Sequence, residues 1–129
     1  PPVALEFSRW RPRPDGEGWQ SELAVQSPAG SDVTWERLER YLLRWDDTFS
    51  VRTLDWREVI RVDEQLPRGG FRGQVMVSPA ESTTEIKQIV DKLYGRDAQG
   101  EEVVVSWTPY KAEAPPVPPK PVAEMPPRK

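Results

Sequence analysis

SPAGSDVTWERLERYLLRWDDTFSVRTLDW, residues 27–56, has a counterpart later in the same chain. SPAESTTEIKQIVDKLYGRDAQGEEVVVSW, residues 78–107, aligns with it without a gap at an offset of 51 positions. Identical residues meet in this alignment, including Ser27 with Ser78, Leu42 with Leu93, Asp46 with Asp97 and Trp56 with Trp107. Such self-similarity predicts one supersecondary unit used twice.

The middle of each copy carries apolar residues at helical spacing. In the first copy these are Trp35, Leu38, Leu42 and Trp45. In the second copy they are Ile86, Ile89, Val90 and Leu93, preceded by Ser82 and Glu85 at the spacing of a capping box and followed by Gly95. Steps of three and four residues place side chains on one helix face. We therefore predict a helix in each copy.

Alternating apolar residues around these segments predict strands. The ranges are 3–8 and 19–25, joined by a Pro- and Gly-rich turn at 11–18, then 49–54, 71–77 and 103–107. The last of these is apolar on both faces, which favours a central position in a sheet. Residues 56–62 fit either a strand or a helical turn.

These elements predict an α+β fold. Two ββαβ units, about 1–56 and 57–110, would be related by a pseudo-two-fold and form one domain over residues 1–110. An antiparallel-rich sheet would be covered by two helices. The matching positions of Trp56 and Trp107 favour equivalent packing in the two units.

Residues 111–129 differ from the rest in composition. This segment is rich in proline and poor in large apolar residues, so we expect an extended C-terminal tail that does not fold alone. Pro115, Pro118 and Lys120 form the pattern P-x-x-P-x-K, which resembles a class II ligand of SH3 domains. The alternatives are a stiff linker and a strap lying on a neighbouring chain.

An arginine and tryptophan cluster marks the first hairpin. It consists of Arg9, Trp10, Arg11 and Arg13. Guanidinium and indole groups together suit a protein interface, and they also suit single-stranded nucleic acid. The net charge of −3 disfavours nucleic acid, because proteins that bind it usually carry a basic excess. We therefore expect this cluster and the tail residues Pro115, Pro118 and Lys120 to bind a protein partner.

The composition restricts the available chemistry. Without cysteine or histidine the chain has no thiolate ligand, no thiol nucleophile and no imidazole base. The acidic pairs at 46–47, 63–64 and 101–102 lack calcium-loop spacing. We therefore predict no catalytic residues, no metal site and no cofactor.

The sequence also lacks a signal-peptide pattern and an apolar run long enough to span a bilayer. The chain begins at Pro1 rather than Met, which indicates a processed product or an excised part of a longer chain.

The resulting expectation is a non-enzymatic interaction or structural module. It would be a soluble subunit of a larger assembly, docking on other protein chains through the Pro-rich tail and the Arg/Trp hairpin. The first alternative is a single-stranded nucleic-acid-binding domain. The second is a hydrolase that depends on a pair of carboxylates.

Overall fold

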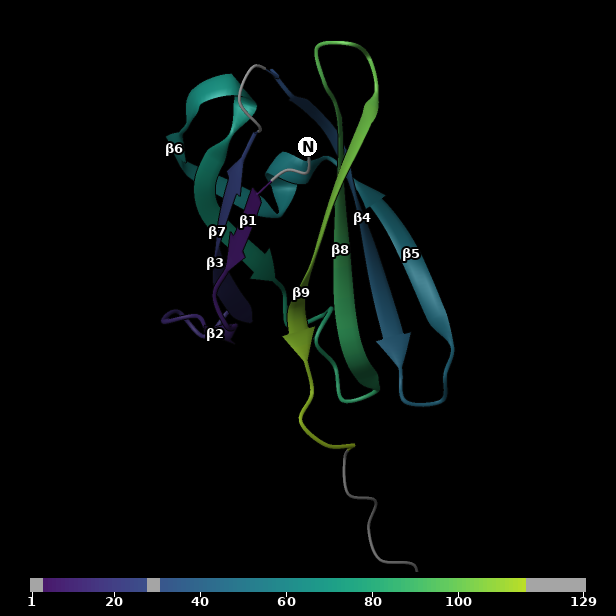
Figure 1. Cartoon of the computed structure of the whole chain (residues 1–129). Helices are drawn as coiled ribbons and strands as arrows, with labels where there is room; N and C mark the ends of the chain where they lie inside the picture. Colours follow the sequence, from purple (N-terminus) through teal and green to yellow (C-terminus); the bar gives the residue numbers. More distant parts are fainter. Residues whose placement is uncertain (1–3, 28–30, 116–129) are drawn as a thin grey trace, which may run out of the picture.

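The computed structural model describes residues 4–27 and 31–115, and these form two antiparallel β-sheets packed face to face (Figure 1). The strands are β1 (Ala4–Phe7), β2 (Arg11–Pro12), β3 (Trp19–Gln26), β4 (Thr34–Arg44), β5 (Phe49–Leu54), β6 (Ile60–Gln65), β7 (Phe71–Val77), β8 (Ile86–Arg96) and β9 (Glu102–Lys111). Two short 3₁₀ turns complete the described part, η1 (Trp56–Glu58) and η2 (Pro67–Gly69). Among the described residues there is no helix that could cross a bilayer.

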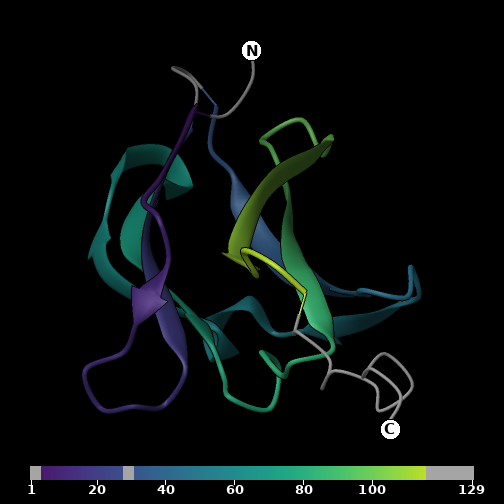
Figure 2. The same ribbon diagram turned by 90° about the horizontal axis from the view of Figure 1, so that it is seen from below.

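Each sheet has one central pair of strands. Sheet A has the order β1-β3-β7-β6, with β2 also pairing with β3. Sheet B has the order β5-β4-β8-β9. Figure 2 shows the two sheets as facing layers. The fold is therefore a β-sandwich.

Strands from the two halves of the chain occupy corresponding places in this sandwich. The first half of the chain gives β1 and β3 to sheet A and β4 and β5 to sheet B; the second half gives β6 and β7 to sheet A and β8 and β9 to sheet B. The halves meet along β3–β7 and β4–β8. In the β4–β8 register Arg40 lies opposite Asp91, 51 positions later. A pseudo-two-fold axis therefore passes between these two residues.

The prediction of an α+β fold with two covering helices was wrong. The segments predicted as helices are the two longest strands, β4 and β8. Each contains one β-bulge residue, Glu36 in β4 and Lys87 in β8, again 51 positions apart. A bulge places one extra residue against the partner strand. Trp35 and Leu38 are therefore both buried although they are three residues apart, and the same holds for Ile86 and Ile89. A spacing of three residues is typical of a helix face, which explains the wrong prediction.

Two smaller predictions also failed. The segment 103–107 lies in β9, which is an edge strand of sheet B and not a central one. Trp56 and Trp107 are not equivalent in the fold, because Trp56 lies in η1 whereas Trp107 lies in β9 opposite Asp91. The two hairpins differ in length. In the longer β8–β9 hairpin Trp107 lies opposite Asp91, whereas in the β4–β5 hairpin Arg52 lies opposite Arg40.

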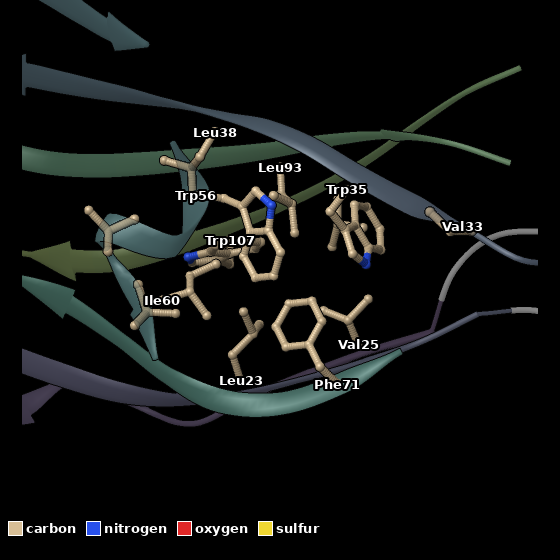
Figure 3. Packing of buried hydrophobic residues seen from close by; sticks show 13 residues of the cluster. Leu23, Val25, Val33, Trp35, Leu38, Trp56, Ile60, Phe71, Leu93 and Trp107 are labelled. Carbon is tan, nitrogen blue, oxygen red and sulfur yellow. The ribbon is translucent and has the colours of Figure 1, made fainter. Parts of the chain in front are cut away.

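The core lies between the sheets and draws on both halves of the chain (Figure 3). The Trp56 ring stacks on Phe71 with centroids 5.4 Å apart, and Trp35 meets Phe71 edge-on at 6.3 Å. Leu38 and Leu93 pack above them from sheet B, and all five side chains are buried. The Trp35 and Trp56 rings of the first half are therefore buried in part by packing on Phe71 of the second half.

Candidate interaction surfaces

The predicted residues Arg9 and Trp10 lie beside a groove between β1 and β9. The groove has a volume of about 480 Å³ and is lined by Leu5, Phe7, Ser8, Arg9, Trp10, Ser106, Trp107 and Thr108. Trp10 is half-buried, and the Arg9 guanidinium lies 5.7 Å from the centre of its ring. Arg9 Nη2 also donates to Glu113 Oε1 at 3.0 Å. The contact joins the first hairpin to the segment that follows β9.

The structure brings only part of the predicted set together. Pro115 is exposed two residues after Glu113, close in sequence to the Arg9 contact. Arg11 is exposed in β2, and Arg13 instead binds Asp15 at 2.6 Å. Pro118 and Lys120 lie outside the described residues. Two of the predicted arginines are thus paired with carboxylates, Arg9 with Glu113 and Arg13 with Asp15. Each pair reduces the positive charge available to bind a phosphate.

The outer face of sheet B carries an apolar surface that the sequence analysis missed. Phe49 is 61% exposed, Val51 44% and Val104 46%, and these are the exposed large hydrophobic residues of the described chain. Tyr41 and Leu43 of β4 lie opposite Val51 and Phe49, and Val90 of β8 lies opposite Tyr41. With Phe49 and Lys92, these three residues line a shallow groove of about 300 Å³. An apolar face of this kind on one sheet indicates an interaction site.

Charged side chains lie among these apolar residues. The Arg37 guanidinium sits 4.1 Å from the centre of the Tyr94 ring, and the Lys92 ammonium 5.1 Å from that of Tyr41. Tyr41 donates to Glu39 Oε1 at 3.0 Å. Hydrogen bonds from Tyr94 and Tyr41 lower the pKa of Glu39, while desolvation and the Glu39 carboxylate raise the pKa of Tyr94 to about 12. The face therefore presents charges of both signs at neutral pH.

The outer face of sheet A has a different character. A groove of about 480 Å³ crosses it, and its lining includes Glu6, Glu22, Asp63, Glu64 and Arg72. Arg72 Nε lies 3.7 Å from Glu64 Oε1. Alternation of buried and charged residues is the usual pattern for an antiparallel sheet with one face in water. Sheet B is therefore the sheet whose outer face departs from that pattern.

A charged cluster is buried between the sheets at the pseudo-two-fold axis. Arg40 is completely buried and donates from Nε and Nη2 to the two carboxylate oxygens of Asp91, each at 2.8 Å. Its Nη1 donates to Glu81 Oε1 and to the Met76 carbonyl, both at 3.0 Å. Trp107 Nε1 donates to Asp91 Oδ2 at 3.1 Å. Each buried charge thus has several partners, as burial requires.

The two carboxyl groups of this cluster shift in opposite directions. Burial raises the pKa of Asp91 although Arg40 opposes the rise. For Glu81 the effect of burial is outweighed by Arg40 together with hydrogen bonds from Ser78, and the pKa is lowered. A pair with separated pKa values is what acid–base catalysis requires. Here, however, both carboxylates face Arg40, and neither lines any of the cavities described above. The cluster links β4 and β8 of sheet B to β7 of sheet A.

Comparison with protein-family models, with curated proteins and with solved structures finds no match to this chain. Among the described residues, no group of three or more acidic side chains is placed to hold a metal ion.

Proposed function

We propose that the protein is a non-catalytic interaction module that serves as a subunit of an assembly, and that the outer face of sheet B joins it to a second copy. The observation that supports this most strongly is the position of Phe49, Val51 and Val104 on that one face. Burying large apolar side chains in an interface contributes roughly 25 cal/mol for each Å² of apolar surface removed from water. Water-exposed phenylalanine and valine thus favour association.

The charges on the same face support a second copy as the occupant. Arg37 and Glu39 are two residues apart in β4, so both side chains point outward from sheet B. In a two-fold interface each copy presents the same surface in the opposite direction. Arg37 of one copy can then lie opposite Glu39 of the other, and the reverse, while the apolar residues of the edge strands β5 and β9 meet on either side of these charges.

The groove beside Arg9 and Trp10 is a second contact zone in this proposal, for other chains of the assembly. Exposed arginine and half-buried tryptophan are residue types enriched in protein interfaces. The Arg9–Glu113 ion pair is highly exposed at both ends and contributes little stability. A partner can therefore displace it at small cost and reach the indole.

Sedimentation velocity over a wide range of protein concentration tests the proposal. We expect the full chain to self-associate, and the double variant Phe49→Lys/Val51→Lys to stay monomeric because two charges would be buried in an apolar contact. The matched control Gln20→Lys/Gln26→Lys adds the same charge to the outer face of β3 and should associate like the unmodified chain. A monomer at all concentrations, or equal association of both variants, would contradict the proposed role of this face.

A further inference from the structure

Strand β5 is an edge strand of sheet B that is regular and exposed. It pairs with β4 on one side, and Figure 1 shows it at the outer side of the sheet, beyond β4. The strand follows the β4 register without a shift, and Phe49 and Val51 are 61% and 44% exposed. A regular edge strand with exposed apolar residues is a template for pairing with a further strand.

The other edges of the two sheets are shortened or interrupted. On one edge of sheet A, β1 has four residues and β2 has two. On the other, β6 has a register shift against β7 between Val62 and Glu64. In sheet B, β9 contains Pro109, and its pairing with β8 shifts near that residue. Short strands, bulges and proline prevent edges from pairing with other chains. Among the strands that the structure describes, β5 is thus the edge strand without such protection.

The backbone groups that β5 turns outward belong to Phe49, Val51 and Thr53. The Arg44 amide donates to the Thr48 carbonyl at 2.9 Å where β4 turns into β5. Opposite residues of an antiparallel pair alternate between hydrogen-bonded and non-hydrogen-bonded pairs. The next pair, at Phe49, is therefore non-hydrogen-bonded, and so are the pairs at Val51 and Thr53. The amides and carbonyls of these three residues point away from β4.

We propose that β5 pairs antiparallel with β5 of a second copy, with Val51 opposite the same residue of that copy on a two-fold axis. Phe49 of each copy then lies opposite Thr53 of the other, so the outward amides and carbonyls of all three residues find partners. Each such pair exchanges two hydrogen bonds. On the outer face valine meets valine and the phenyl ring meets threonine, which are favourable cross-strand neighbours.

The side chains on the inner face of β5 are compatible with this register. Arg52 of each copy lies opposite Ser50 of the other, so no like charges are directly opposite each other. Arg52 Nη1 also donates to Glu81 Oε2 of its own chain at 3.1 Å, which offsets its charge. The edge contact leaves the outer face of sheet B uncovered, so it adds to the face contact proposed above and does not depend on it. A chain with two different two-fold contacts can form species larger than a dimer.

Disulfide crosslinking tests the register, because the chain contains no cysteine of its own. Opposite Cα atoms of a hydrogen-bonded pair lie about 5.5 Å apart, within the range that a disulfide spans. We expect Val51→Cys to form a covalent dimer under mild oxidation, detected by non-reducing electrophoresis. Phe49→Cys and Thr53→Cys should crosslink with each other when mixed. Neither should crosslink with itself, since the equivalent residues of the two copies are then about 13 Å apart along the strands.

Val104→Cys is the matched control on β9. Its exposure of 46% is close to that of Val51, and it lies on the face proposed to meet a second copy. Packed sheets lie about 10 Å apart, which is too far for a disulfide, so this variant should stay uncrosslinked even where the face contact forms. Absence of the Val51→Cys dimer, or equal crosslinking of Val104→Cys, would overturn the edge pairing. Self-association of the unmodified chain in that case would leave the face contact standing.

The backbone hydrogen bonds are tested by adding Thr53→Pro to Val51→Cys. Proline removes the outward amide of residue 53 and no bond to β4, so the fold should be retained, which circular dichroism checks. The two copies together lose a pair of hydrogen bonds, and the crosslinking rate should fall by about fivefold or more. Thr53→Ala in the same background keeps the amide and should stay close to the rate of Val51→Cys alone. Equal rates for the proline and alanine variants would refute pairing through the backbone.

Discussion

Arg40 is the residue on which both sheets depend. Its guanidinium connects β8 through Asp91, β7 through the Met76 carbonyl and the loop after β7 through Glu81. Arg52 approaches the same Glu81 carboxylate at 3.1 Å from the outside. One buried and one exposed arginine thus share a partner, which makes them a matched pair for measuring the effect of burial.

We expect Arg40→Met to lower the free energy of unfolding by about 3–5 kcal/mol, because Asp91 would be left as a buried charge without its counterion. Arg52→Met should cost less than about 1 kcal/mol, since the Arg52 side chain is 52% exposed. Urea denaturation followed by tryptophan fluorescence measures both. Similar losses for the two variants would mean that the buried cluster does not stabilise the fold as described.

At the scale of the element, the two bulges set which side chains enter the core. Glu36 is the extra residue of β4 and Lys87 that of β8. Successive side chains of a strand point to opposite faces, so one extra residue reverses the faces beyond it. Without the bulge in β4, Trp35 would point to the outer face of sheet B while Leu38 stayed in the core.

Deleting Glu36 should therefore destabilise the protein far more than replacing it. The deletion is expected to cost about 3 kcal/mol or more, because Trp35 leaves the core or the strand shifts its register. Glu36→Ala should stay within about 0.5 kcal/mol, since that side chain is exposed. Urea denaturation and the tryptophan emission wavelength provide the measurements. A deletion variant as stable as Glu36→Ala would show that the bulge is dispensable.

The same elements explain what the sequence could and could not predict. Alternation predicted β1, β3 and β7, because most of their inward positions are apolar. It also predicted β5, although the alternating Phe49 and Val51 of that strand are exposed. In β4 and β8 the alternation is hidden twice. The bulge lengthens one step to three residues, and the buried positions Arg40 and Asp91 are charged. A pattern of apolar and polar residues assigns a charged residue to the exposed face, because it does not reveal the counterion that allows the residue to be buried.

The candidate interaction surfaces were also predictable only in part. Arg9 and Trp10 could be identified from composition alone, but the contact with Glu113 spans 104 positions and leaves no local signal. The apolar face of sheet B was missed because Tyr41 and Leu43 were assigned to a helix. Once β4 is a strand, they alternate with the buried Arg40 and Leu42 and must point outward.

At the scale of the whole molecule, neither half has a core of its own. β3 pairs with β7 and β4 with β8, so each half alone would lose the central partner of both its sheets. Trp56 of the first half also stacks on Phe71 of the second. The halves should therefore fold only together.

Splitting the chain between Glu58 and Val59, directly after η1, tests this expectation. Each fragment alone should show a disordered far-ultraviolet circular dichroism spectrum, and an equimolar mixture should regain that of the intact chain. A uniformly ¹⁵N-labelled fragment would show dispersed amide resonances only with its unlabelled complement. If either half folds unaided, the shared core described here is not required for folding.

The pairing of Arg40 with Asp91 carries a consequence for how such a molecule could arise by gene duplication. In a symmetric dimer of two identical half-length chains, the residue at this position would lie opposite the same residue of the other chain. A charged residue would then be buried against a second residue of the same charge. Opposite signs become available there only after both copies are encoded in one reading frame and can mutate separately. The buried pair would then be younger than the duplication, and an uncharged side chain would have preceded it.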